Sequence, residues 1–407
     1  MRIILLVVVL LTSISCALGK SELRSPHEEV DALVQKVKEL DEAGRYQEAI
    51  LCAQKLLGIT EKTLAKDHPD VAKRLDNLAT HYQWTSQYTE AEPLYKRSLE
   101  IREKALGKDH PDVALVLNNM ASLYQYTGRY AAAEPLLKRS LEIREKALGR
   151  DHPDAAMSLN DLAELYRATG RYVEAEALFK RSLEIVEESM GKDHPGVTPV
   201  LHKIAFFYGL TGRYAEAEVL HKRSLEITER ALGKDHPEVA NKLGWIAGIY
   251  QDTGRHAEAE VLLKRSLEVR EKTLGRDHLD VAYTLNGLAL FYQDTGRYAE
   301  AEISFKRSLE IAEKYMGKDH LGVTPLLWNV ALFYQSTGRF AEAEVLLKRS
   351  LDILEKSLGR HNPRVAEVLT TLAELYAATG KHVDSHKIFS RGIAIEDKKR
   401  EDINRYF

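Results

Sequence analysis

Histidines recur along this sequence at a fixed spacing of 42 residues. Seven of them stand in phase: His68, His110, His152, His194, His236, His278 and His320. Imidazole is a common metal ligand, but several ligands must converge on one ion at about 2 Å. With one histidine per repeat, each ring lies a whole repeat from the next. We therefore place these histidines in the turns between repeats and predict no metal site.

A serine follows a Lys-Arg pair once per repeat, which is the pattern of a basophilic kinase substrate. The serines are Ser98, Ser140, Ser182, Ser224, Ser266, Ser308 and Ser350. Serine is also a small residue that lets two helices cross at close range. We expect this second, structural role.

Catalytic signatures are missing from the sequence. It contains no H-E-x-x-H, Walker loop, G-x-S-x-G or C-x-x-C pattern. The 58 basic and 61 acidic side chains are interspersed and give a formal charge of -3, which argues against a nucleic-acid footprint. We predict a non-enzymatic protein that takes no cofactor, no metal and no small-molecule substrate.

Carboxamide side chains recur on one face of the first helix of each repeat, where the repeats differ from one another. They are Asn77, Asn118, Asn119, Asn160, Asn286, Asn329, Gln83, Gln125, Gln251, Gln293 and Gln335. An amide donates and accepts at once, so a ladder of amides can bind a peptide backbone whatever its side chains. The alternative is that these residues are simply solvated polar groups on an exposed face.

Aromatic residues interrupt this ladder at Trp84, Tyr126, Phe206 and Trp328. Exposed aromatic side chains on a concave face are natural anchors for a partner. Some of them can instead pack between neighbouring repeats. The mixture of amides and aromatics favours a peptide or protein partner.

Two helices must position these residues, and both are readable in the unit from Pro111 to Gly149. Apolar residues at Val113, Leu117, Ala121 and Tyr124 follow the helical spacing. Gly128 ends this first helix, because glycine readily adopts the left-handed conformation of a helix C-terminus. A second helix then extends to the glycine that closes the unit.

Complete helix pairs are expected to begin near Pro69, Pro111, Pro153, Pro195, Pro237, Leu279, Leu321 and Pro363. A degenerate pair precedes them, as is typical of a repeat that caps a stack. The sequence thus predicts an all-α solenoid. Its expected parts are an export signal (1–19), an N-terminal segment with the degenerate repeat (20–68), eight repeats (69–396) and a charged tail (397–407).

Two of these pairs are irregular at their start. The segments from Met190 and Met316 agree at thirteen of nineteen positions and lie three repeats apart. Gly196 and Gly322 weaken the usual helix start, while a Thr-Pro pair follows each of them. We predict that both helices begin three to four residues late, with the threonine as N-cap, and that each leaves a notch.

The N-terminus has a different character. Arg2 precedes an apolar stretch from Ile3 to Leu11, followed by small residues at Ala17 and Gly19, which is typical of a cleavable export signal. The alternatives are an uncleaved anchor or a lipoprotein attached to the membrane through Cys16. We expect a periplasmic or secreted protein.

The repeat resembles the tetratricopeptide repeat. The 42-residue period and the phrases AEPLYKRSLEIREKALGKDHPDVA from Ala91 and LNNMASLY from Leu117 resemble the kinesin light chain type, over about 370 residues. The resemblance implies a right-handed superhelix whose inner wall binds an extended or helical peptide. It also implies that Asn77, Asn118 and Asn119 bind peptide backbone. The light chain's long heptad segment has no counterpart here.

Two functions remain as alternatives. The first is a protein–protein interaction scaffold that binds a peptide or protein segment in its concave groove. The second is a structural solenoid that self-associates or braces a cell-envelope assembly.

Overall fold

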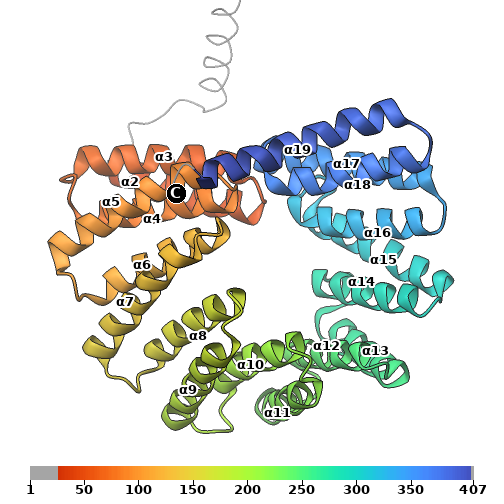
Figure 1. Ribbon diagram of the computed structural model, residues 1–407, viewed down its shortest axis with the longest axis horizontal. Coiled ribbons are helices and arrows are strands. Elements are labelled where there is room, and N and C mark those ends of the chain that lie inside the picture. Colours follow the sequence, from red (N-terminus) through yellow and green to blue (C-terminus); the bar gives the residue numbers. More distant parts are fainter. Residues whose placement is uncertain (1–25, 405–407) are drawn as a thin grey trace, which may run out of the picture.

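The computed structural model describes residues 26–404, which contain helices and turns but no strand. The helices form nine antiparallel pairs within this range (Figure 1). The first helices of the pairs are α2 (Pro26–Glu42), α4 (Pro69–Trp84), α6 (Pro111–Tyr126), α8 (Pro153–Ala168), α10 (Thr198–Leu210), α12 (Pro237–Asp252), α14 (Leu279–Asp294), α16 (Thr324–Ser336) and α18 (Pro363–Ala378). The second helices are α3 (Tyr46–Thr63), α5 (Tyr88–Leu106), α7 (Tyr130–Leu148), α9 (Tyr172–Met190), α11 (Tyr214–Leu232), α13 (His256–Leu274), α15 (Tyr298–Met316), α17 (Phe340–Leu358) and α19 (His382–Asn404). The predicted all-α solenoid is confirmed.

The histidines in phase cap the first helices. Before α6, Nδ1 of His110 accepts a hydrogen bond from the main-chain N–H of Asp112 at 3.1 Å. Pro111 occupies the first turn, where its missing N–H leaves no donor unpaired. The same cap recurs at His68, His152, His194, His236, His278 and His320. Among the described residues, no group of three or more metal-binding side chains gathers.

The turn inside each pair depends on glycine. Gly128 has φ +73°, and the next main-chain N–H, that of Arg129, donates to the carbonyl of Tyr124 at 2.8 Å. A side chain at this φ is strained, so the predicted left-handed role of this glycine is confirmed.

A tyrosine, a glutamate and an arginine join neighbouring pairs. The Tyr124 hydroxyl donates to Glu92 at 3.0 Å and Arg129 donates to the other oxygen of Glu92 at 2.7 Å. The Arg129 guanidinium also lies 4.1 Å from the centre of the Tyr124 ring, within reach of a cation–π contact. The tyrosine and arginine contacts both recur at Glu134, Glu176 and Glu218. One repeated joint therefore sets the angle between successive pairs.

The serines of the Lys-Arg-Ser phrase are buried where the two helices of a pair cross. Ser140 is fully buried, and its hydroxyl donates to the carbonyl of Ala114 at 3.0 Å. Ser98, Ser182, Ser266 and Ser308 make the equivalent bond. Burial at the crossing confirms the structural role expected from the sequence.

The two irregular pairs differ in part from the prediction. The α-helices α10 and α16 do begin at Thr198 and Thr324, but the 3-10 helices η1 (Pro195–Val197) and η2 (Leu321–Val323) occupy the preceding residues. The expected threonine cap is wrong: the Thr198 hydroxyl donates to the carbonyl of Pro195 at 2.9 Å. A Cβ at position 196 would lie 2.6 Å from Sδ of Met190. The Met190 side chain would have to move to admit a larger residue, and the 3-10 helices occupy the stretches where we expected a notch.

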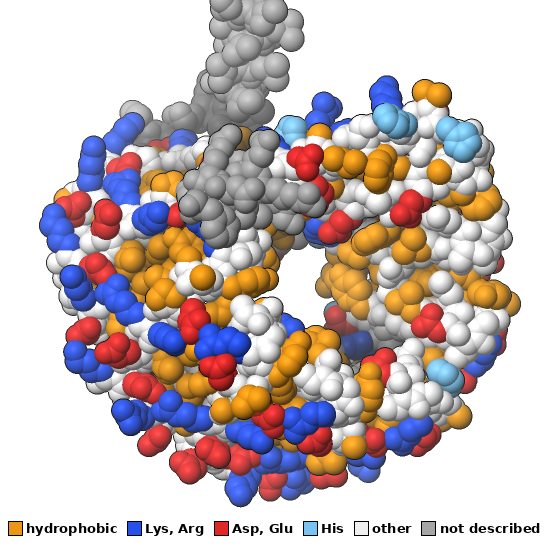
Figure 2. All heavy atoms as spheres, in the orientation of Figure 1, with side chains coloured by type: hydrophobic (Ala, Val, Ile, Leu, Met, Phe, Trp, Pro, Cys, Tyr) orange, Lys and Arg blue, Asp and Glu red, His pale blue; other side chains and the backbone are white. Residues whose placement is uncertain are grey.

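The pairs wind into about one turn of a superhelix around a central opening (Figure 1). Helices α6, α8, α10 and α12 face this opening, whereas α7, α9, α11 and α13 lie outside them. Figure 2 shows basic and acidic side chains interspersed over the outside and apolar side chains around the opening. Helix α3 contacts α17, so the first and eighth pairs meet.

No helix between residues 26 and 404 is both long and apolar enough to cross a bilayer. The predicted export signal and Cys16 lie outside the described residues.

Candidate peptide-binding groove

We define the groove as the surface formed by the inward faces of the first helices. On α6 this face carries Leu115, Asn118, Asn119, Ser122 and Tyr126, which lie one, three or four residues apart and share one side of the helix. Leu115 and Tyr126 are 46% and 63% exposed. Their exposure leaves a partly apolar surface with carboxamides set within it.

Side chains pair across neighbouring first helices at a sequence separation of 43 residues. The Asn118 amide donates to a carboxylate oxygen of Asp161 at 2.9 Å, and Asn329 donates to Asn286 at 3.1 Å. The side-chain amides of Asn118 and Asn329 therefore already donate hydrogen bonds within the protein, which the sequence did not reveal. The Oδ1 of Asn118 is buried and accepts no hydrogen bond within residues 26–404.

The other predicted carboxamides differ in exposure. Asn77 is exposed, Asn119, Gln125 and Gln251 are half-buried, and Asn160 is buried. The Gln83 amide donates to the Ser122 hydroxyl at 3.1 Å. Gln83 therefore lies on the predicted ladder, but its side-chain amide already donates within the protein. The structure thus brings these residues onto one wall, and it does not make them equivalent.

Three of the unsatisfied polar atoms on the first helices lie on α14 and α16. Within the described chain, Oε1 of Gln293, Oε1 of Gln335 and Nε1 of Trp328 are buried and have no hydrogen-bond partner. A buried polar atom without a partner costs about 1–3 kcal/mol. Leu290 and Leu332 lie on the same helices, with 37% and 39% of their surface exposed. This stretch combines acceptors, a donor and apolar surface.

The predicted aromatic residues occupy two environments. Tyr126 is largely exposed, and Trp84 is 53% exposed although its ring meets Tyr46 edge-on at 5.7 Å. Trp328 is half-buried. Tyr126 and Trp84 thus offer surface to a partner, whereas Trp328 contributes mainly to packing between neighbouring first helices.

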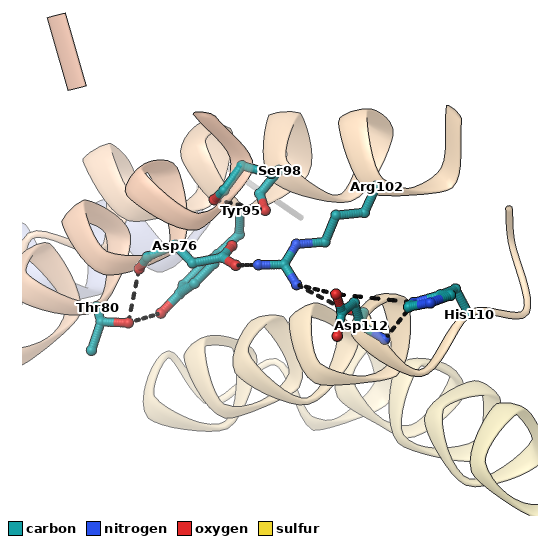
Figure 3. A network of polar contacts seen from close by, with 8 residues as sticks. Asp76, Thr80, Tyr95, Ser98, Arg102, His110 and Asp112 are labelled. Atoms are coloured by element: carbon teal, nitrogen blue, oxygen red, sulfur yellow. Dashed lines mark hydrogen bonds and ion pairs between the residues drawn. The ribbon is translucent and has the colours of Figure 1, made fainter. Parts of the chain in front are cut away.

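An arginine and an aspartate line a cavity of about 390 Å³ between α4 and α6 (Figure 3). Arg102, on α5, forms an ion pair with Asp76 and donates to the carbonyl of Asp112 at 3.3 Å. Burial raises the pKa of the Asp76 carboxyl despite this ion pair. Lys73 also lines the cavity and is exposed. This cavity can accept a polar side chain of a bound segment.

A second cluster packs around Trp245 on α12. The imidazole of His202 stacks on the Trp245 ring with centroids 3.6 Å apart, and Nζ of Lys242 lies 4.2 Å from the same ring. His221 lies behind them, and burial lowers its pKa to about 4. Since both His202 and Lys242 cover Trp245, we regard this cluster as a packed part of the wall.

Sequence reasoning missed Asp161 and Arg102 as groove residues. The signal for Arg102 was available, because arginine recurs at 144 and 270 while the equivalent positions 186, 228, 312 and 354 hold Val, Thr, Ala and Leu. No such signal was available for Asp161. Its hydrogen bond with Asn118 spans one repeat plus one residue, and the sequence contains no pattern that indicates this pairing.

The sequence matches the tetratricopeptide repeat family over residues 73–146, 112–188, 154–203, 238–314, 280–325 and 322–397, and again over residues 39–70 and 200–238. This chain belongs to the tetratricopeptide repeat family. Tetratricopeptide repeats are typical of protein–protein interaction scaffolds, and generally of non-enzymatic ones. Comparison with curated proteins gives no significant match.

Solved structures include several with similar repeats. A putative kinesin light chain of Podospora anserina with nearly identical TPR-like repeats is 29% identical, over 51% of this chain and 98% of that chain, with a TM-score of 0.44. BtubC (BKLC) from P. vanneervenii is 20% identical, over 62% and 93% of the two chains, with a TM-score of 0.45. The apo form of the quorum sensor NprR from B. thuringiensis is 17% identical, over 91% and 98%, with a TM-score of 0.51. The last likeness shows that this tetratricopeptide repeat chain shares its fold with NprR.

Proposed function

We propose that this protein is a non-enzymatic scaffold that binds a peptide or protein segment along the groove. The observation that carries the proposal is the inward face of α14 and α16, where the half-buried Gln293 and Gln335 lie beside the exposed Leu290 and Leu332. An extended backbone supplies N–H and C=O groups alternately, so it can pair with carboxamide side chains, which both donate and accept, while its own side chains cover the leucines.

A display library of random peptides tests this proposal. The wild-type protein is expected to select peptides that a Gln293→Ala/Gln335→Ala variant binds at least about tenfold more weakly, the loss expected for about 1.4 kcal/mol. Val219→Ala/Val261→Ala is the control, because both residues lie on second helices and are 65% exposed. Equal selection by the wild type and the groove variant would exclude this site.

One observation favours a structural role as a second candidate. Val219, Val261, Ile303 and Val345 occupy equivalent positions on four consecutive second helices, and each is at least 65% exposed. β-branched residues are poor helix formers at exposed positions, so this stripe fits an association surface. Sedimentation over a concentration series tests it: the wild type should self-associate and a Val261→Lys/Ile303→Lys variant should remain monomeric.

We further propose that the protein is exported. The support is the sequence pattern of residues 1–19. The intact mass of the protein recovered from its native host separates the alternatives, because cleavage removes the leader, lipidation adds acyl chains to Cys16, and an uncleaved chain keeps its full mass. A cytoplasmic, full-length protein would contradict export.

A further inference from the structure

The two ends of the superhelix meet in a contact that we call the seam. Three hydrogen bonds cross it. The Asn362 amide donates to the carbonyl of Thr85 at 3.1 Å, Nε2 of His320 lies 3.2 Å from the carbonyl of Glu42, and the Gln47 amide donates to the carbonyl of Leu358 at 3.2 Å. Each bond joins residues between 277 and 311 positions apart.

Two of these bonds are similar: their donors are one repeat apart, at 320 and 362, and their acceptors are 43 residues apart, at 42 and 85. His320 and Asn362 both cap their own helix, through Nδ1 and Oδ1, and each uses its second polar atom to reach the earlier end of the chain. Their partners are carbonyls at the C-terminal ends of α2 and α4. Carbonyls at a helix end have no partner inside the helix, so the seam satisfies groups that would otherwise need water.

The residues at the seam depart from the repeat. Position 362 is asparagine, where seven other repeats have histidine. Position 47 is glutamine, whereas the equivalent residues at 131, 215, 257, 299 and 341 are alanine. Both departures introduce an amide, and both amides bond across the seam. Chance changes scattered along the chain would not be expected to meet there.

The backbone also approaches closely at the seam. A Cβ added to Gly44 would lie 3.2 Å from Nε2 of His320 and 3.3 Å from Cβ of Leu321. The equivalent Gly128 has nearly the same φ but nothing within 4 Å of such a Cβ. Asn362 and Thr85 are 3% and 2% exposed, so the bond between them is shielded from water. Tyr46 adds an apolar contact with the C-terminal core.

We propose that the seam is an intramolecular lock that holds the solenoid as a closed ring, and that the bound segment is encircled by it. This rests on the proposed function for the identity of the occupant. A free chain end can thread through a closed ring. An internal segment flanked by folded domains can enter only when the seam opens. Three hydrogen bonds and a small apolar contact form a lock that can open without unfolding any repeat.

Distances between spin labels test the lock without any partner. The labels replace Leu51 on α3 and Val345 on α17, which are 64% and 65% exposed, in a background with Cys16 and Cys52 changed to serine. The seam variant carries Gln47→Ala, His320→Asp and Asn362→Asp. Aspartate keeps an acceptor for the helix cap but removes the donor, and alanine is the residue at the position of Gln47 in five other repeats, so each change preserves its own helix.

We expect one narrow distance in the wild type, and in the seam variant a distribution broadened or lengthened by about 10 Å, one helix diameter. The control variant, His152→Asp/His236→Asp, changes the same cap away from the seam and should match the wild type. Gly44→Ala should also open the seam, whereas Gly128→Ala, with the same backbone strain, should not. Identical distributions in the wild type and the seam variant would overturn the lock.

Association kinetics then test encirclement. A peptide selected from the display library is placed between two folded domains, so that it has no free end. If the open form is a minor state of 10% or less, the seam variant should bind this ligand at least about tenfold faster than the wild type. Equal rates would overturn encirclement. A lock confirmed by the distances together with no peptide bound at all would count against the proposed function alone.

Discussion

His202 stacks on Trp245 with the two rings 3.6 Å apart and 18° from parallel. The two residues are separated by 43 positions, as are Asn118 and Asp161. The same position of the groove wall thus supports an aromatic stack in one joint and a hydrogen bond in another. The chemistry of the groove therefore changes along its length while its backbone geometry does not.

His221 behind this stack predicts a pH dependence. Burial lowers its folded pKa to about 4 from an ordinary 6.5, so between these values the unfolded chain binds a proton that the folded chain does not. Stability should fall as the pH drops from about 6.5 to about 4. His221→Leu, which takes the residue of positions 137, 263 and 347, should remove about 2 kcal/mol of this loss.

Urea unfolding at pH 8, 6 and 4.5 measures the effect. The nearby groups that face His221 are His202, whose pKa burial also lowers, and Lys242. A His202→Leu variant separates their contributions. If the His221→Leu variant loses stability as steeply as the wild type between pH 6 and 4.5, the assignment is wrong.

The glutamates of the joints predict the course of acid unfolding. Hydrogen bonds, from Lys138 to Glu134 and from Arg213 to Glu176, lower the pKa of both carboxyls to about 2. A lowered carboxyl pKa stabilises the fold above the unfolded value of about 4.5, and this contribution is lost as the pH falls towards 2. Helix content by circular dichroism should therefore persist at pH 4.5 and decline below it.

Salt provides a check on this explanation, because 1 M salt shortens the screening length to about 3 Å. The acid midpoint should then move to higher pH. A midpoint that is independent of salt would show that the joints do not govern acid unfolding.

Two buried serines form a matched pair for a stability measurement. Ser140 donates to the carbonyl of Ala114 at 3.0 Å, whereas the equivalent Ser224 has no partner within the described chain. Ser140→Ala should destabilise the protein by about 1 kcal/mol, the net value of one hydrogen bond. Ser224→Ala should be neutral or stabilising, since it removes an unsatisfied hydroxyl. Equal shifts of the urea midpoint in the two variants would contradict this reading.

The histidine caps predict a further effect on stability. His152→Ala should cost about 1 kcal/mol and raise amide exchange in the first turn of α8, because it removes an acceptor for the N–H of Asp154. His152→Asn should cost little, since Asn362 makes this cap at α18. Hydrogen exchange followed by mass spectrometry resolves the two, and comparable exchange in both variants would rule out capping as the function of the histidine.

The sequence predicted features that depend on a few adjacent residues. Apolar spacing identified the helices, glycine identified the turns, and the Gly-Val-Thr-Pro phrase indicated where α10 and α16 begin. It did not identify the role of Thr198, because a hydroxyl that donates to a carbonyl three residues earlier and one that caps a helix occur in the same local sequence.

The groove residues were identified as a set but not in their roles. Helical spacing placed Asn118 and Gln83 on one wall. Whether their amides are free depends on the distance to Asp161 and Ser122 on the next helix, which follows from the packing angle of the joint. The seam is even harder to predict from the sequence, because the contact between the two ends depends on the sum of all the angles between successive helix pairs around the ring.

The repeated joint of tyrosine, glutamate and arginine has a consequence for how this gene can change. Because successive joints are alike, one 42-residue unit could be lost or copied in the middle of the chain without disturbing any neighbour. The hydrogen bond between Asn362 and Thr85 would be lost after such a change, because it forms only when a fixed number of repeats lies between the two residues. The individual units are thus interchangeable, but their number is not.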